Sequence, residues 1–573
     1  MAQQPSSRIG ALARHLSAPR AEVEVEDLAL RAWPDASGGG CDSCGSGSCG
    51  SGKDQQSQVP KNVLFPAATA AARSVATPLS ALAWPAGAPV EEPEIRTAEE
   101  YINSLRGRII KVFIQGEEVR DYVDHPIVWP SVNALAETYR LAQENPALGS
   151  AIGFSGVRMS RFLHIAESAE DLVLQSHMQR ELGRRTGTCF QRCVGMDAAN
   201  AMWSTTFDID QKHGSSYHQR FQDFLKTMQK QNCVIGGAMT DVKGDRMLTP
   251  SQQEDPDLFV HIHRRLPNGG IVLRGAKAHQ TGTLNSHWMI VMPGAALKEA
   301  DKDYAVCCAI PIDAPGITYI YGRQSCDLRA MEVGNEIDQG NAKFGGQETM
   351  VCFEDVEVPP ELVFMDGEVE FTGLLVERFT AYHRRSYVCK AGLGDVMLGA
   401  AATVSDYNGT SKASHIKDKL VEIAFLNETI AGTALAASYG GKPTPSGNFL
   451  PEILMANVCK QHVTRMPYEI ARLTQDLAGG FLVTLPGDKE FSHPVAGALL
   501  EKYMKAKKGV TVENRRRILR LIENMTMGRN AVGYLSESMH GAGSPQAQRV
   551  LIARLMDLEA KKKLAKHLAG IVE

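Results

Sequence analysis

The hydrophobic and polar positions divide most of the chain into a helical block, a β-rich block and a second helical block. Apolar residues recur at helical spacing through 97–235, and Thr97 with Glu100 predicts a capping box where the first helix begins. Short β-rich runs separated by Gly, Pro, Asn and Asp fill 236–366, and helical patterns return over 367–573. The chain is therefore predicted to be an α+β protein, with an N-terminal helical domain, a middle β domain and a C-terminal helical domain.

Residues 1–96 differ from these blocks, because they are rich in Ala, Ser, Gly and Pro and show little sustained periodicity. The first 21 residues contain Arg8, Arg14 and Arg20 but no acidic residue, and apolar side chains recur there at helix-like spacing. This composition is typical of a mitochondrial transit peptide. The extension is therefore predicted to be a targeting segment, with a disordered tail on a cytoplasmic protein as the alternative.

A Gly/Ser-rich stretch within the extension carries Cys41, Cys44 and Cys49. Three thiols at this spacing could bind a metal ion. Because Gly and Ser neither bury nor orient the thiols, a flexible linker is the favoured interpretation.

The overall composition excludes several classes of protein. The chain has 573 residues, of which 43% are hydrophobic and 22% charged, and its net charge is −4. There is no basic stripe for nucleic acid, and no uninterrupted apolar run of the length that crosses a bilayer. We therefore expect a globular protein that binds neither nucleic acid nor membrane.

Two cysteines in the sequence TGTCFQRCVG raise the question of a metal centre. Cys189 and Cys193 are four residues apart, which on a helix places both thiols on one face with Cβ atoms about 5–6 Å apart. That spacing suits two ligands of one metal centre. Two buried cysteines on a core-facing helix would give the same pattern.

A second stretch, AYHRRSYVCKAG, carries His383, Tyr387, Cys389 and Lys390 within eight residues. Such groups are costly to bury unless they have partners. Together with the first two thiols they would form a set of three cysteines and one histidine, which suits zinc or an iron–sulfur cluster. The alternative is a polar helix end with a solvated face.

The β-rich block and the C-terminal region add further candidate groups. The glycines of GGAMTDVKGDR and RGAKAHQTG would let backbone approach a ligand, and Thr240, His279, Gln280 and Thr281 can hydrogen-bond a heteroaromatic ring or phosphate. There is no G-x-G-x-x-G after a strand, so a standard Rossmann site is not predicted. Turn chemistry alone would also explain the glycines. The Gly-rich stretches FGGQE and SESMHGAGSPQAQR contribute Glu348 and Glu537, each either a base or a surface acid.

These stretches together, with YGRQSCD, ERFTAYHRRSY and CKAGLGD, resemble the 4-hydroxybutyryl-CoA dehydratases, a branch of the 4-hydroxyphenylacetate 3-hydroxylase family. The resemblance runs from about residue 97 to the C-terminus. It implies a fold like that of acyl-CoA dehydrogenases, with a β-barrel-like middle domain and a C-terminal helical bundle. It also implies a homotetramer that acts on acyl-CoA and holds FAD and one [4Fe–4S] cluster in each active site.

The resemblance also implies roles for individual residues. The positions that match cluster ligands are Cys189, Cys193, His383 and Cys389. The positions that match catalytic residues are Thr281, Glu348, His383, Tyr387, Lys390 and Glu537. The positions that match flavin contacts are Thr240, Lys243, Gly244, Asp245, Arg246, His279, Gln280 and Thr281. His383, alone or with Glu348 or Glu537, would be the base at C2 of the substrate.

The chain departs from the family pattern at one place. Five residues separate His383 from Cys389, and the family pattern has one residue more. Within a helix the difference would rotate Cys389 and Lys390 by about 100°, whereas a turn would absorb it.

The implied reaction removes water from 4-hydroxybutyryl-CoA to give crotonyl-CoA, with isomerisation of vinylacetyl-CoA as a second activity. Because the C3 hydrogen is not activated, acid–base catalysis of about 10²–10⁴-fold would be insufficient, so flavin electron transfer and a Lewis-acidic iron are expected to take part. Three alternatives stay open: a flavin-dependent aromatic monooxygenase of the same superfamily, an isomerase only, and a non-catalytic scaffold with structural zinc.

Overall fold

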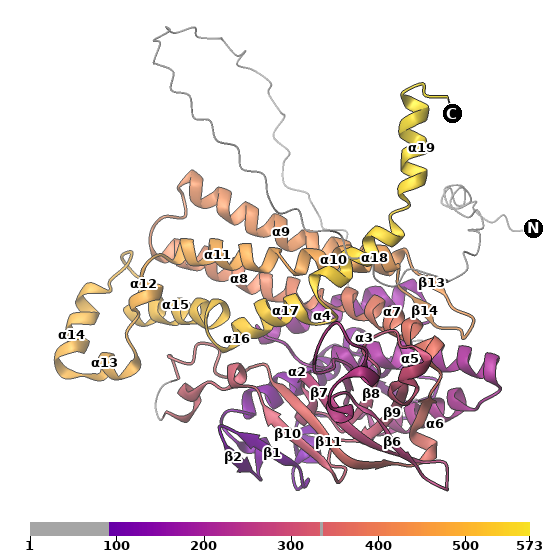
Figure 1. The fold of residues 1–573 in the computed structure, drawn as a ribbon. Helices are drawn as coiled ribbons and strands as arrows, with labels where there is room; N and C mark the ends of the chain where they lie inside the picture. The colour runs from indigo at the N-terminus through magenta and orange to yellow at the C-terminus, as the bar shows by residue number, and fades with distance from the viewer. Residues whose placement is uncertain (1–90, 333–335, 573) are drawn as a thin grey trace, which may run out of the picture. The chain divides into compact units, whose positions relative to one another are not determined.

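The computed structural model describes residues 91–332 and 336–572, all within one compact unit, Ala76–Glu573 (Figure 1). Most of the predicted 1–96 extension, including Arg8, Arg14, Arg20, Cys41, Cys44 and Cys49, lies outside the described residues. Mitochondrial targeting therefore stays a prediction, as do the exact domain boundaries.

The first block is mainly helical. Thr97 accepts a hydrogen bond from the backbone of Glu100 and the Glu100 carboxylate accepts one in return, so the predicted capping box is present. The helices are α1 (Ala98–Leu105), α2 (Trp129–Glu144), α3 (Pro146–Gly149), α4 (Ala169–Thr186), α5 (Cys193–His213) and α6 (Tyr217–Gln231). Four short strands accompany them: β1 (Lys111–Ile114), β2 (Glu117–Val119), β3 (Ser150–Ile152) and β4 (Arg158–Ser160).

The middle block forms two sheets that share a hydrophobic core. The larger sheet has the order β2-β1-β10-β11-β7-β6, so it recruits β1 and β2 from the first block, and the smaller sheet has the order β12-β9-β8-β5. The strands are β5 (Ile235–Ala238), β6 (His261–Arg265), β7 (Ile271–Thr281), β8 (Trp288–Val291), β9 (Val306–Pro311), β10 (Ile317–Tyr321), β11 (Glu348–Val358) and β12 (Val363–Asp366). The antiparallel register of β7 and β11 places Thr281 directly opposite Glu348.

The C-terminal block returns to helices, which lie above the sheets in Figure 1. They are α7 (Val369–Ser386), α8 (Cys389–Tyr407), α9 (Ser414–Tyr439), α10 (Ile453–Val463), α11 (Met466–Ala478), α12 (Phe481–Thr484), α13 (Asp488–Ser492), α14 (Pro494–Tyr503), α15 (Val512–Thr526), α16 (Arg529–Ala531), α17 (Glu537–His540), α18 (Pro545–Leu555) and α19 (Leu558–Leu568), with a π-helical turn at Val532–Ser536 and the short strands β13 (Lys442–Pro443) and β14 (Phe449–Leu450). The helix–β–helix order confirms the predicted α+β fold class.

Helices α4 and α8 approach each other closely because two glycines face each other. A Cβ atom on Gly183 would lie 2.3 Å from the carbonyl oxygen of Cys389, and one on Gly392 would lie 2.1 Å from the carbonyl oxygen of Arg180. This contact fixes the first turn of α8, and therefore Cys389 and Lys390, against the N-terminal helices.

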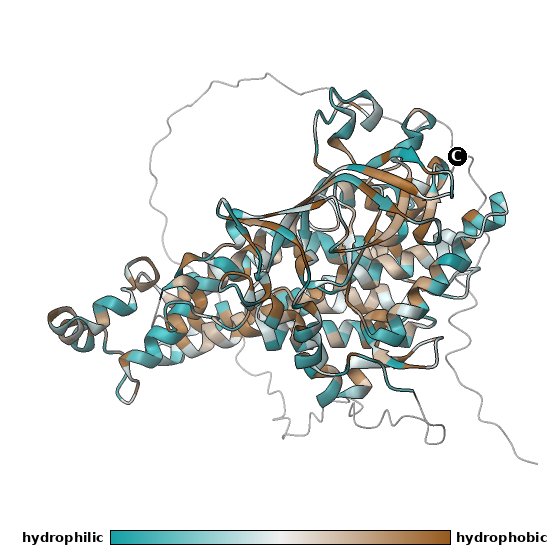
Figure 2. Ribbon diagram, turned by 90° about the horizontal axis from the view of Figure 1, so that it is seen from below, coloured by the Kyte–Doolittle hydropathy of each residue, from teal (hydrophilic) through white to brown (hydrophobic). Residues whose placement is uncertain are grey.

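Two helical stretches, Val369–Tyr407 and Ser414–Tyr439, are long and apolar enough to cross a membrane by length and composition alone. The first is mostly buried, as a core helix of a globular protein is. Figure 2 shows mixed hydrophobic and hydrophilic residues along the helices, so these stretches are weak grounds for a membrane protein.

Candidate active site

The first cysteine pair is arranged differently from the prediction. Helix α5 begins at Cys193, and Cys189 lies in the preceding loop, where Gln191 has a φ of 64°. The two thiols are therefore not one turn apart on a single helix face, as the spacing had suggested. The loop still keeps both side chains in the same interior region, where Cys189 interacts electrostatically with Cys389 and Glu537.

The third cysteine approaches the pair from a distant part of the chain. Cys389 is the first residue of α8 and its thiol interacts with that of Cys193. Burial raises the pKa of Cys193, whereas hydrogen bonding to Cys193 lowers the pKa of Cys389. Burial also raises the pKa of Cys189. Buried thiols of this kind become thiolates when a bound cation supplies the compensating charge.

The short spacing between His383 and Cys389 is absorbed by a turn. Helix α7 ends at Ser386, Tyr387 and Val388 form a turn, and α8 begins at Cys389. The rotation expected within one continuous helix therefore does not apply.

His383 is oriented by a buried carboxylate. Its Nδ1–H donates to Asp197 Oδ2 at 2.7 Å, and Ser386 Oγ donates to the other Asp197 oxygen at 2.9 Å. The lone pair therefore resides on Nε2. Metal-binding histidines commonly have this carboxylate partner, which fixes the ring and leaves Nε2 as the ligand. Asp197 was not predicted, although its position four residues after Cys193 on α5 is a usable signal.

Beside the thiols lies a buried, ionised carboxylate. Glu537 Oε1 accepts from the Tyr387 hydroxyl at 2.9 Å, and Glu537 Oε2 accepts from Lys390 Nζ at 2.6 Å. Burial alone would raise the pKa of Glu537, but the Lys390 ammonium, together with Lys460 and the Tyr387 hydrogen bond, outweighs it and the pKa is lowered. Lys390 also donates to the carbonyl of Gly533 at 2.7 Å, in the π-helical turn that precedes Glu537. Such turns often occur at functional sites.

The second carboxyl group has the opposite protonation state. Thr281 Oγ1 lies 2.8 Å from both carboxyl oxygens of Glu348. Burial and the nearby Glu537 charge raise the pKa of Glu348 well above its ordinary value. The site therefore holds one neutral and one anionic carboxyl group near each other, which is the pattern of an acid and a base.

Sequence reasoning missed Lys460, a buried lysine on α10. Its Nζ lies 3.8 Å from the centroid of the Tyr387 ring and donates to the carbonyl of Ser538, next to Glu537. Burial lowers the pKa of Lys460 from its usual 10.5 to about 7. The only signal in the sequence is a lysine in an apolar helix, which carries no motif.

Part of the predicted flavin segment adjoins the carboxyl groups. The backbone N–H of Ala278 and the side chain of Gln280 both donate to the carbonyl of Thr240, at 2.9 and 3.1 Å, so the 240 segment is tied to the end of β7. His279 has a strained φ of 34°, and its pKa is lowered by burial and by the nearby Lys243. It also interacts electrostatically with His540 and Glu537, which connects this segment to the carboxylates.

The rest of the predicted flavin segment is exposed. Lys243, Gly244, Asp245 and Arg246 lie in a surface loop, in which Gly244 has a φ of 52°. Two cationic side chains and a glycine turn suit a pyrophosphate, and the polar groups at the end of β7 suit a flavin ring, so the residues present fit FAD. The three thiols and the oriented imidazole likewise fit an iron–sulfur cluster.

Two protein-family models match most of the chain. The family model described as 4-hydroxyphenylacetate 3-hydroxylase N terminal matches residues 97–365, and the C-terminal model matches 372–570. The chain belongs to the 4-hydroxyphenylacetate 3-hydroxylase family.

Within that family, the chain is 51% identical over 489 residues to the 4-hydroxybutyryl-CoA dehydratase/vinylacetyl-CoA-Δ-isomerase of Clostridium aminobutyricum, covering 83% of this chain and 100% of the relative. The structure of an oxygen-tolerant archaeal 4-hydroxybutyryl-CoA dehydratase from N. maritimus superimposes with a TM-score of 0.82 at 62% identity, over 84% of this chain and 96% of that one. The predicted resemblance is therefore confirmed. The oxygenase component of 4-hydroxyphenylacetate 3-monooxygenase complexed with FAD shares the fold, with a TM-score of 0.73 at 22% identity over 83% of this chain and 98% of that one.

Proposed function

We propose that the protein dehydrates 4-hydroxybutyryl-CoA to crotonyl-CoA and isomerises vinylacetyl-CoA to the same product. One observation carries the proposal: three thiols and an oriented imidazole adjoin a pair of carboxyl groups in opposite protonation states. An aromatic monooxygenase that uses reduced flavin and oxygen needs no such ligand set. The similarity to two dehydratases, at 51% and 62% identity, supports the same assignment.

The proposal includes two cofactors. Cys189, Cys193, Cys389 and Nε2 of His383 would hold a [4Fe–4S] cluster. FAD would contact the segment 240–246 and His279–Thr281. When bound, the flavin supplies one-electron chemistry and an iron supplies a Lewis acid for the C4 hydroxyl group.

The protein's own groups would handle the protons. His383 is the proposed base at C2, because its Nδ1–H is held by Asp197 and its Nε2 carries the free lone pair. The same lone pair is the one that would bind iron, so the two roles alternate. Glu537, kept anionic by Lys390, can accept a proton, and Glu348, kept neutral by burial, can donate one.

Lys460 completes this proposed machinery as a positioning residue. It lies beneath the Tyr387 ring and holds the Ser538 carbonyl, so it fixes both the phenol and the helix turn that carries Glu537. Tyr387 and Lys390 then present two donors to Glu537 and, in its place, to a substrate oxygen.

An isomerase without dehydratase activity is the second candidate. The carboxyl pair could move a proton between C2 and C4 of vinylacetyl-CoA without iron. This reading is favoured only if the ligand set fails to assemble a cluster.

The assembly is proposed to be a homotetramer. Helices α12–α14 extend away from the neighbouring helices in Figures 1 and 2 and expose apolar side chains, Val483, Val495, Leu499 and Tyr503. A second copy of the chain is the proposed occupant of this surface. Sedimentation of the purified protein tests it, and a monomer at micromolar concentration would contradict it.

The activity is tested with protein purified without oxygen. Formation of crotonyl-CoA is measured separately from 4-hydroxybutyryl-CoA and from vinylacetyl-CoA, and oxygen-dependent hydroxylation of 4-hydroxyphenylacetate is measured in parallel. We expect both CoA substrates to be converted and the phenol to be unchanged. Conversion of vinylacetyl-CoA alone would favour the isomerase, and hydroxylation of the phenol would overturn the proposal.

A further inference from the structure

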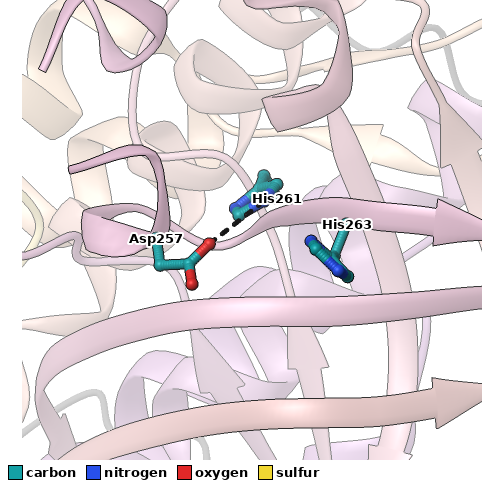
Figure 3. Close-up of side chains that lie close together, drawn as sticks. All are labelled: Asp257, His261 and His263. Carbon is teal, nitrogen blue, oxygen red and sulfur yellow. Dashed lines mark ion pairs between the residues drawn. The ribbon is translucent and has the colours of Figure 1, made fainter.

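Outside this site, three potential metal ligands gather at the edge of the larger sheet. Asp257 lies in a 3₁₀ turn, Pro256–Leu258, and His261 and His263 lie on β6, the edge strand that follows. Their ligand atoms all lie within 4.8 Å of one another. Figure 3 shows the His261 imidazole directed at the Asp257 carboxylate, with His263 beside them.

The geometry of His261 suits a metal ligand. Its Nδ1–H donates to the carbonyl of Phe259 at 3.2 Å, which leaves the lone pair on Nε2. That Nε2 lies 3.5 Å from Asp257 Oδ1. Two ligands of one tetrahedral zinc ion, each bonded at about 2.0–2.1 Å, stand roughly 3.4 Å apart. The fixed tautomer is the usual arrangement at protein metal sites.

His263 lies at an irregularity in the edge strand β6. The register between β6 and β7 shifts between Ile262 and Arg264, so His263 occupies a β-bulge. Bulges at sheet edges re-aim a side chain. His263 is exposed and can rotate toward the other two ligands.

We propose that Asp257, His261 and His263 bind a divalent transition-metal ion such as zinc, with solvent completing its coordination. One carboxylate and two imidazoles are ligands that zinc prefers. The competing cation is Arg274, which lies 3.8 Å from the other Asp257 oxygen. Its guanidinium is paired with both carboxyl oxygens of Asp355, at 2.7 and 3.0 Å, so Asp257 is available to the metal.

The bound ion would tie the 3₁₀ turn to the edge strand. This turn follows the segment that carries the proposed flavin contacts. The Tyr304 hydroxyl also holds the turn, because it donates to the carbonyl of Pro256 at 3.0 Å. The ion therefore has a structural role, and the inference does not depend on the proposed reaction.

The test uses the full-length protein with its own cofactors, incubated with zinc and passed through a desalting column. Zinc retained per chain and the melting temperature are compared for the parent, His261→Ala/His263→Ala and the control His415→Ala, which changes an exposed histidine elsewhere. We expect the double variant to retain one zinc fewer than the parent and the control to match the parent. Zinc should raise the melting temperature of the parent and not of the double variant.

Equal zinc retention and equal thermal response in the parent and the double variant would overturn the proposal. Unchanged flavin and iron content in the double variant shows that it is folded. If the double variant does not fold, zinc binding is measured in two milder variants, His263→Ala at an exposed position and the isosteric Asp257→Asn. Each should weaken zinc binding at least tenfold. Parental zinc binding in both variants would refute the site.

Discussion

The two sides of the candidate active site are built differently. On the helical side, the His383, Glu537 and Lys390 side chains are each held by partners from another helix or loop. On the strand side, Thr281 is paired with Glu348 and Gln280 with the carbonyl of Thr240, but the loop that carries Lys243 and Arg246 is open to solvent. Contacts within the fold therefore hold the side chains of the helical side in place. The strand side keeps polar groups available for a ligand.

The largest effect is expected from replacing a cysteine on the helical side of the site. Cys389→Ser should remove most of the bound iron and abolish dehydration while flavin is retained, because ligand loss typically costs metal sites most of their affinity. Iron, flavin and crotonyl-CoA formation are measured together. The control is Cys459→Ser, which changes a buried thiol on α10 outside the ligand set. Iron retention equal to that of the control would remove Cys389 from the set.

Matching substitutions of the two carboxyl groups should both lower activity but should differ in their effect on stability. Glu348→Gln and Glu537→Gln should each lower the turnover number by about 10²–10⁴-fold. Glu537→Gln should also destabilise the protein by about 3–5 kcal/mol, because it leaves the Lys390 ammonium buried without a counter-charge.

Glu348→Gln should leave the stability at pH 7 equal or higher. In the parent protein the pKa of Glu348 is raised. Above the ordinary pKa of a glutamate, the unfolded chain therefore releases a proton that the folded chain keeps, so the stability of the parent falls as the pH rises. Glutamine removes that dependence. The two stability predictions are checked by thermal unfolding of Glu348→Gln and Glu537→Gln. Equal destabilisation of the two variants would contradict the assigned protonation states.

A smaller effect should follow from crowding Tyr387. A Cβ atom on Gly541 would lie 1.6 Å from the Tyr387 hydroxyl oxygen, so Gly541→Ala must displace the phenol from Glu537. Misplacement of about 1 Å can cost 10²-fold in rate, and we expect a loss of that order. Gly399→Ala is the matched control, because its added Cβ would meet no described atom within 4 Å apart from its own stretch of helix. Steady-state kinetics that show equal rates for the two variants would argue against a role for Tyr387.

The smallest effect is expected at Lys460. Lys460→Met should lower the turnover number about tenfold through the lost contact with the Tyr387 ring. Because its pKa is lowered to about 7, the unfolded chain binds more protons than the folded chain between about pH 7 and 10, and stability rises with pH in that window. The variant should therefore show a shallower rise of melting temperature with pH than the parent, and the exposed Lys412→Met should match the parent. A parental slope in Lys460→Met would contradict the lowered pKa of the buried Lys460.

Much of this arrangement could be predicted from sequence, and the exceptions have physical reasons. The capping box at Thr97 and the helix–β–helix order follow from local pattern. The pairing of Thr281 with Glu348 depends on a strand register set by distant residues. Cys189 leaves the helix because the tight loop at Gln191 precedes α5, which the four-residue spacing does not reveal. Lys460 is recruited only by tertiary packing, so no local signal marks it.

We propose that an iron–sulfur cluster beside the carboxyl pair is held by Cys189, Cys193, His383 and Cys389. The most direct measurement is the iron, sulfide and flavin content of protein purified without oxygen, together with its visible spectrum. We expect about four irons, about four sulfides and one flavin per chain, with iron lost from Cys389→Ser. Flavin without iron, or zinc in place of iron in a colourless protein, would rule out the proposed cluster.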